Sequence, residues 1–145
     1  MSEHFLSKFP LEDQFITWLC SRLQDGYVSK KTVVTTDTTA GALTYTAAML
    51  LGGIILRDPN GAARSDVTPT AALLAAAIPN VKAGTSFEFT IRNDGSGVET
   101  ITVTAGTGCT LSGTMTIAVS NSKRFLVVFT STAAYTLYSL GTVVH

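Results

Sequence analysis

The sequence predicts a mainly β protein: a jelly-roll-like β-sandwich with an N-terminal amphipathic helix and one short helix near residues 69–77. Short runs that alternate apolar and polar residues predict strands, and Gly, Asn and Ser turns separate these runs at intervals of about 10–12 residues. A helical repeat of apolar residues is confined to the N-terminus. We therefore expect a helical arm over residues 1–30 and a β-sandwich domain over residues 31–145.

The N-terminal stretch has the pattern of an amphipathic helix. Pro10 suits the first helical position, and Gly26 suits a C-terminal stop. Between them an apolar stripe recurs at helical spacing, with a tryptophan beside it: Leu11, Phe15, Trp18, Leu19 and Leu23. A single helix of about fourteen residues does not bury so apolar a face by itself. We expect it to dock on its own β domain, on a sister subunit or on another protein.

The residues after the arm predict short elements and a tight turn. Strands are expected at 31–36 and 43–46. Residues 47–51 suit a helical turn and residues 54–56 suit a strand, although apolar runs this short are ambiguous. The Arg-Asp-Pro-Asn-Gly sequence at 57–61 is a strong turn signal, since Pro restricts φ and Asn-Gly tolerates positive φ.

Five further strands are expected, at residues 86–93, 99–104, 114–119, 124–130 and 135–140. A hairpin turn at 94–97 is expected to join the first two of them, and Asn121 with Ser122 to form a turn before the fourth. The strand at 124–130 is apolar on both faces. Either it is central in the sandwich, which we favour, or its second face meets another subunit.

One short helix and a set of alternating residues complete the predicted core. Thr68 is expected to cap that helix, with Pro69 in its first turn, so that Leu73, Leu74 and Ile78 lie on a sheet. The strand residues expected to point inward are Phe87, Phe89, Ile91, Ile101, Val103, Met115, Ile117, Phe125, Val127 and Phe129.

The composition is poor in charge. Charged residues make up 14% of the chain, against roughly 25% in a typical soluble protein. Ten basic and ten acidic residues give a formal net charge of zero, and no basic run is present. Binding to nucleic acid through phosphate neutralisation therefore has no visible footprint. Because a small monomer relies on charge to stay separate, the shortage favours an oligomer over a neutral, Thr-rich monomer.

No segment suits a membrane span or a secretory signal. The most apolar run, residues 47–56, is interrupted by Gly52 and Gly53 and is shorter than the roughly 20 residues that a span needs. The first ten residues lack the apolar stretch of a signal peptide. We expect a protein made in a cytosol that does not insert into a membrane.

The residue types that carry chemistry are few and scattered. His4 and His145 lie near the ends, where solvated side chains are expected rather than a general base. Cys20 and Cys109 form neither a metal pair nor a redox motif, and two buried thiols are favoured over a disulfide. One loop holds three oxygen donors for calcium, but the spacing matches no known loop motif: Asp58, Asn60 and Asp66. We therefore assign no catalytic residue, no cofactor and no metal site.

Four segments in order resemble a string of motifs found in viral proteins: residues 66–74, 81–93, 100–108 and 124–129. Similar strings occur in head-fibre, capsid decoration and minor capsid proteins of tailed phages and large DNA viruses. The resemblance implies a β-rich, surface-exposed and usually trimeric module. It extends from about residue 43 to about residue 140 and leaves the first thirty residues outside.

The leading hypothesis is a non-enzymatic virion structural protein, made in the host cytoplasm and assembled on the virion surface as a homotrimer. Its partners would be the major capsid protein or other virion proteins. We expect Leu11, Phe15, Trp18, Leu19 and Leu23 to attach the protein to the capsid; alternatively, the helix packs on its own trimer.

The main alternative is a receptor- or carbohydrate-binding tip module of a viral fibre. Such tips present aromatic side chains on loops, and here Tyr27 and Tyr45 are the aromatic residues best placed for that role. A β-sandwich enzyme is a third class, disfavoured because no catalytic set is visible.

Overall fold

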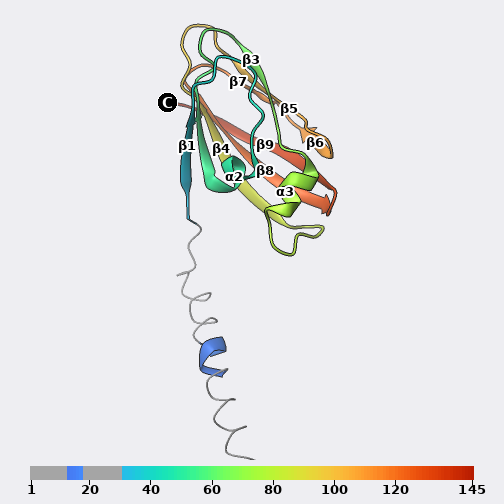
Figure 1. Cartoon of the computed structure of the whole chain (residues 1–145). Helices are drawn as coiled ribbons and strands as arrows, with labels where there is room; N and C mark the ends of the chain where they lie inside the picture. Colours follow the sequence, from blue (N-terminus) through green and yellow to red (C-terminus); the bar gives the residue numbers. More distant parts are fainter. Residues whose placement is uncertain (1–12, 18–30) are drawn as a thin grey trace, which may run out of the picture. The chain divides into compact units, whose positions relative to one another are not determined.

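The computed structural model describes residues 13–17 and 31–145 (Figure 1). The chain divides into two compact units, Met1–Lys31 and Thr32–His145. In the first unit, residues 13–17 are helical and exposed, within the stretch where the sequence predicts a helix. The rest of that predicted helix lies outside the described residues.

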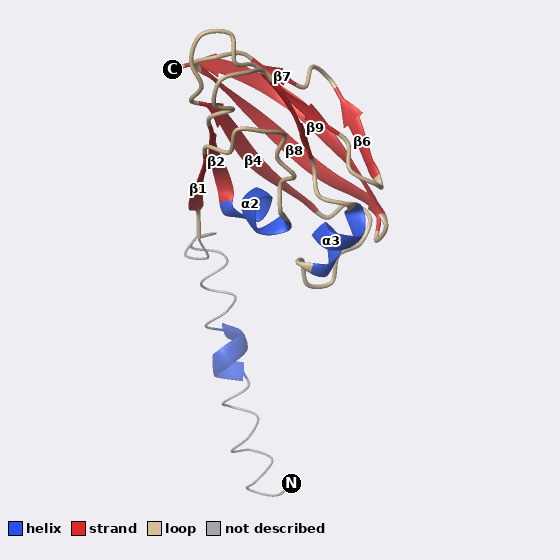
Figure 2. Ribbon diagram, turned by 45° about the horizontal axis from the view of Figure 1, so that its top comes forward, coloured by secondary structure: helices blue, strands red, loops and turns tan. Residues whose placement is uncertain are grey.

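In the described part of the second unit, the strands form two sheets (Figure 2). The large sheet has six strands in the order β1 (Val33–Asp37), β2 (Gly53–Arg57), β4 (Ser86–Asn93), β8 (Asn121–Ser131), β9 (Ala134–Val144) and β6 (Cys109–Ser112). The small sheet has three, in the order β3 (Arg64–Val67), β5 (Ile101–Thr104) and β7 (Thr116–Ile117). The predicted mainly β, sandwich-like fold is confirmed.

The strand pairing is mixed. β8 pairs antiparallel with both β4 and β9, so it lies inside its sheet. The burial of both faces implied by the favoured interpretation is not observed, because Leu126 and Val128 are only partly buried and Arg124 is exposed. The pairs β1–β2, β2–β4, β6–β9 and β3–β5 are parallel, which the sequence did not predict. Parallel neighbours need a crossover between them. The chain between β1 and β2 contains the short helix α2 (Ala47–Gly52), and α3 (Ala71–Ala76) precedes β4.

Both short helices begin at a threonine cap. The Thr46 side chain accepts a hydrogen bond from Met49 N at the start of α2. At α3 the cap is Thr70, which accepts from Leu73 N at 3.3 Å. The prediction that Thr68 caps this helix was therefore wrong. The Thr68 hydroxyl instead accepts from Gly106 N at 2.9 Å, so it joins two loops rather than starting a helix.

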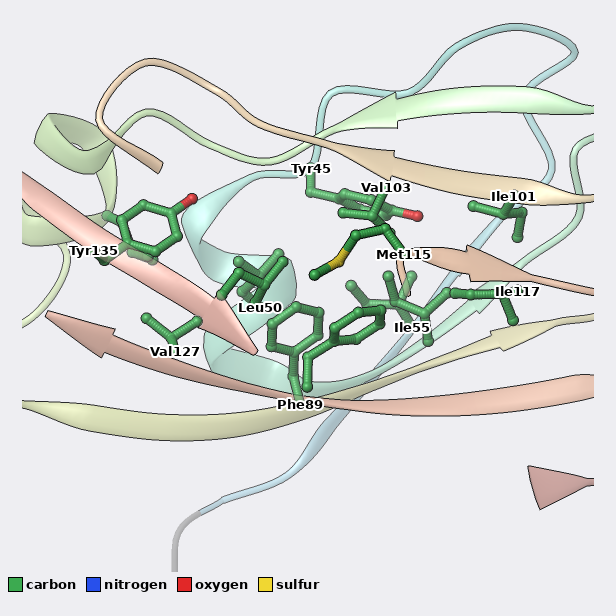
Figure 3. Close-up of a cluster of buried hydrophobic side chains, with 14 of the residues drawn as sticks. Tyr45, Leu50, Ile55, Phe89, Ile101, Val103, Met115, Ile117, Val127 and Tyr135 are labelled. Atoms are coloured by element: carbon green, nitrogen blue, oxygen red, sulfur yellow. The ribbon is translucent and has the colours of Figure 1, made fainter. Parts of the chain in front are cut away.

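The hydrophobic core lies between the two sheets and is completed by the helices (Figure 3). Of the ten predicted core residues, nine are buried, and Phe87 is partly buried against the same cluster. Phe89 and Phe125 stack with ring centroids 5.3 Å apart. The core also includes residues outside that prediction: Tyr45, Leu50, Ile55, Ala71, Leu74, Tyr135 and Leu137.

Leu73 contradicts the prediction for α3. Leu74 is fully buried and Ile78 is partly buried against the core, as expected, but Leu73 is 63% exposed. Successive residues of a helix point about 100° apart, and with Leu74 directed into the core, Leu73 is turned toward solvent.

Several predicted turns and strand limits were wrong. Residues 94–97 do not close a hairpin, because β4 belongs to the large sheet and β5 to the small one. Asn121 and Ser122 lie within β8, and the turn precedes them at Ser120, which has φ 59°. The predicted strand at 43–46 reduces to an isolated bridge between Thr44 and Val67.

Side-chain hydrogen bonds explain why the chain changes sheets after β4. The buried Asn93 amide donates to Glu99 O and to Ile117 O, at 2.7 and 3.0 Å. The Glu99 carboxylate accepts from Ser96 N at 2.8 Å and from Gly61 N at 2.6 Å. These contacts hold the connection against the turn at 57–61 and against β7. Asn60 and Gly61 have φ 52° and 97°, as the predicted turn requires.

Candidate functional site

The large sheet has two unlike faces. On its inner face, alternate residues of β4 and β8 are fully buried against the small sheet and the helices, including Phe89, Phe125 and Val127. The residues between them point the opposite way, and each is only partly buried or exposed. Within residues 31–145, no element covers these side chains.

The strand register defines this second face, which we call the outer face. Rows cross the strands from Ile54 through Thr90 to Arg124, and from Leu56 through Arg92 to Ser122. A third row runs from Glu88 through Leu126 to Tyr138. The outer face comprises Val34, Thr36, Ile54, Leu56, Glu88, Thr90, Arg92, Ser122, Arg124, Leu126, Val128, Thr136, Tyr138 and Val143.

A depression marks one part of the outer face. Arg124 pairs with Gly141 and Phe125 pairs with Ser139, so Leu140 has no partner across the ladder and forms a β-bulge. Beside this bulge lies a depression of about 350 Å³. Its lining combines one guanidinium group, three hydroxyl groups and aliphatic side chains: Thr90, Ser122, Arg124, Leu140, Gly141, Thr142 and Val143.

The charges on and beside the outer face are paired. Arg124 Nε lies 3.5 Å from Glu88 Oε2, and both side chains are at least half exposed. Arg92 donates to the Asp94 carboxylate at the rim. Exposed pairs such as these each contribute at most about 1 kcal/mol to folding. Their consequence is electrostatic: two basic and two acidic groups leave this surface without an excess of either sign.

His145 is an exposed residue, as the sequence predicted, but its side chain makes specific contacts. Its side chain is 24% exposed, its Nε2 lies 3.4 Å from Asp94 Oδ1, and its Nδ1 lies 3.2 Å from Ser122 Oγ. Its backbone N–H also donates to Ser120 O at 2.9 Å. These contacts dock the residue beside the rim of the outer face. His4 lies outside the described residues.

The calcium ligands considered from the sequence do not assemble. Asp58 Oδ1 accepts from Asn60 N at 2.8 Å, which is a local turn contact. Asp66 is fully buried elsewhere: its Oδ2 accepts from Arg57 Nε at 2.9 Å and from the Tyr45 hydroxyl at 3.0 Å. Among the residues that the structure describes, no group of three or more His, Cys, Asp or Glu side chains could hold a metal ion.

Asp66 instead belongs to a buried polar cluster with Arg57 and Tyr45. Arg57 Nη1 also donates to Thr39 O at 2.8 Å and to Asp37 Oδ1 at 3.2 Å. Burial and the nearby Asp66 carboxylate hold the pKa of Tyr45 well above its ordinary value, so its hydroxyl stays protonated and donates. Burial opposes the charge of Arg57, but hydrogen bonds and attraction to Asp66 outweigh it and raise the Arg57 pKa. The cluster ties β2 of the large sheet to β3 of the small one.

A second buried cation, Lys123, ties the sheets together two strands away from β2, on β8. Its Nζ donates to Thr114 O and to Thr116 O, both at 2.7 Å, beside β7. Burial lowers the pKa of this lysine. Sequence reasoning missed both cations, although a signal existed. Lys123 shares the inward parity of Phe125, and Arg57 shares that of Ile55.

The remaining candidates from the sequence are only partly described. Of the five expected attachment residues, Phe15 is described and is 60% exposed, while Leu11, Trp18, Leu19 and Leu23 lie outside the described residues. Cys109 is partly buried and carries a free thiol, and Cys20 lies outside as well. Tyr45 is buried, so it presents no aromatic ring to a ligand, and Tyr27 is not described.

Comparisons with known proteins identified no relative of this chain. No protein-family model matches the chain, and neither a curated protein nor a solved structure matches it. Among the described residues, no helix is long and apolar enough to cross a membrane.

Proposed function

We propose that this chain is a non-enzymatic structural protein of a virion: a capsid decoration, head-fibre or minor capsid protein that assembles as an oligomer on the particle surface. The observation that carries the proposal is the outer face of the large sheet. It is broad and largely uncharged, and within residues 31–145 nothing covers it. Half of its named residues are apolar, and exposed apolar patches commonly mark interaction sites.

The composition supports the same conclusion. With 14% charged residues and no net charge, the chain has little electrostatic repulsion between its copies. Assembly would cover part of the surface that charge does not protect. The resemblance of four ordered segments to viral surface modules supports the virion as the place of assembly, and it implies a homotrimer.

The N-terminal stripe supports an attachment role toward the major capsid protein or another virion protein. Each large apolar side chain of the stripe, Trp18 among them, would gain roughly 1.5–3 kcal/mol on full burial. The described core residues all belong to the second unit. We therefore propose that residues 10–25 bind the particle and that the β domain projects from it.

A receptor- or carbohydrate-binding tip is the second candidate. One observation favours it: the depression beside Leu140 brings Thr90, Ser122 and Arg124 together, and such groups bind sugar hydroxyls or carboxylates. Its lining contains no aromatic ring on which a sugar could stack, and Tyr45 is buried. The structural role is therefore preferred.

The test is to purify intact virions and count this chain against the major capsid protein. The proposal expects a fixed stoichiometry that survives high-salt washing, because the contacts are largely apolar. Trp18→Ala should lower occupancy, whereas Val98→Ala, which truncates an 85% exposed side chain of the β domain, should leave it unchanged. A chain absent from washed virions would contradict the proposal. Full occupancy by a chain that starts near Lys30 would contradict attachment by the helix.

A further inference from the structure

The outer faces of the two sheets differ in chemistry, which narrows where copies of the chain meet. On the small sheet the outward row runs from Ser65 through Thr102 to Thr116, and the two threonine hydroxyl oxygens lie 3.4 Å apart. Water can form hydrogen bonds with these hydroxyl groups. The corresponding rows of the large sheet mix polar and charged side chains, such as Thr90 and Arg124, with five large apolar ones: Ile54, Leu56, Leu126, Val128 and Tyr138.

The outer face approaches the size of a standard protein interface. Strands lie about 4.8 Å apart and rise about 3.3 Å per residue, so strands of typical length in a sheet of this width span roughly 24 by 20–26 Å. The accessible surface of such a face exceeds its flat projection and approaches the roughly 800 Å² that each partner buries in a standard complex. Its aliphatic side chains and Tyr138 lie on β1, β2, β9 and the later part of β8, while its charged side chains lie on β4 and the early part of β8. The face therefore mixes apolar and polar groups, as protein interfaces do.

The balance of charge on the outer face indicates which kind of partner it suits. A surface for nucleic acid or an anionic membrane would carry excess positive charge, but here Arg124 is matched by Glu88, and Arg92 by Asp94. A surface that carries both signs in equal number is complementary to another copy of itself, since Arg124 of one copy can face Glu88 of the next.

From these observations we infer that the outer face of the large sheet is the interface between copies of this chain, with a second copy as its occupant. The inference rests on the oligomeric part of the proposed function and concerns the surface rather than the number of copies. The depression beside Leu140 then receives a side chain from the neighbouring copy. The face of the small sheet stays in water.

The test measures the mass of the full chain by light scattering and sedimentation at micromolar concentrations. The wild type should be oligomeric. Tyr138→Glu and Val143→Glu, at positions 40% and 69% exposed, should weaken self-association at least tenfold. Matched controls on other surfaces, Thr102→Glu and Val98→Glu, should keep the wild-type mass. Circular dichroism and thermal unfolding establish that each variant is folded.

Exchanging the charges of Arg124 and Glu88 tests the proposed interface independently. Arg124→Glu alone should weaken association, because it sets two carboxylates beside each other and against those of the next copy. Adding Glu88→Arg restores one charge of each sign and should recover the wild-type mass. A structural defect at Arg124 would not be rescued in this way.

Three results would overturn the inference, and they are distinguishable. A monomeric wild type, both free and on the particle, also removes the oligomeric part of the proposed function. An oligomer that tolerates Tyr138→Glu and Val143→Glu overturns the interface alone. A free monomer that loses its place on virions through Tyr138→Glu assigns the outer face to another virion protein instead of a second copy.

Discussion

The two sheets of this domain share one core but present different chemistry to the outside. The small sheet turns a row of Ser65, Thr102 and Thr116 outward, whereas the large sheet turns apolar residues such as Leu126 and Tyr138 outward beside charged ones. Inward, both supply fully buried aliphatic residues, such as Ile101 and Ile91. The difference shows that the alternation of side chains along a strand does not by itself decide whether the outward face contacts solvent. The side chains at the outward positions decide whether water or a partner is the better neighbour.

The largest expected effect lies in the shared core. Phe89→Ala should lower the free energy of unfolding by about 3–5 kcal/mol, because it removes a fully buried ring stacked on Phe125 and leaves a cavity. Chemical denaturation followed by fluorescence or circular dichroism measures the loss. A change below about 1 kcal/mol would mean that the inner and outer faces had been exchanged, because a one-residue slip in register reverses them.

The second-largest loss of stability is expected when the buried ion pair that links the two sheets is broken. Asp66→Asn should cost about 3 kcal/mol, because it leaves the buried Arg57 guanidinium without its main counter-charge. Asp58→Asn, in the nearby turn, serves as the control and should cost less than about 1 kcal/mol. Equal losses for the two variants would show that the buried pair does not join the sheets.

Tyr45 contributes a smaller and pH-dependent effect. Tyr45→Phe should cost about 1.5 kcal/mol at neutral pH, since it removes a hydrogen bond to a charged carboxylate. The pKa of Tyr45 in the folded state lies above its ordinary value of 10.0, so its contribution is complete below pH 10 and falls as the pH rises further.

Denaturation of both proteins between pH 8 and pH 11 measures this loss. The stability difference between wild type and Tyr45→Phe should be constant below pH 10 and shrink above it. Lys123 works in the opposite direction up to pH 10.5, because burial lowers its pKa, but it is present in both proteins and cancels. A difference that grows above pH 10 would contradict the assignment.

The smallest change in unfolding free energy is expected for substitutions on the outward faces of the two sheets, and these test the difference between the faces most directly. Tyr138→Ser on the large sheet and Thr102→Ala on the small sheet should each change the unfolding free energy of dilute protein by about 0.5 kcal/mol or less. At higher concentration the Tyr138→Ser penalty should grow, because association stabilises only the wild type. Denaturation midpoints over a hundredfold range of concentration measure this, and parallel behaviour of both variants would remove the distinction between the two faces.

The sequence by itself determined the fold class and most of the strand core. Period-two alternation from Phe87 to Ile91 and from Phe125 to Phe129 identifies the inward residues, because the pleat places every second side chain on one face. The Asn-Gly turn at 60–61 was also readable, since local steric rules alone allow its positive φ values. These features depend only on neighbours along the chain.

Only the tertiary structure decided which strands become neighbours. The sequence predicted a hairpin at 94–97, yet Asn93 and Glu99 hold this connection against distant loops and send β5 into the other sheet. The buried cluster of Arg57, Asp66 and Tyr45 likewise joins residues up to 21 positions apart. The outer face was equally hidden, because its members come from strands distant in sequence. Local patterns report which way a side chain points, but pairing over long separations depends on free energies that exist only in the assembled fold.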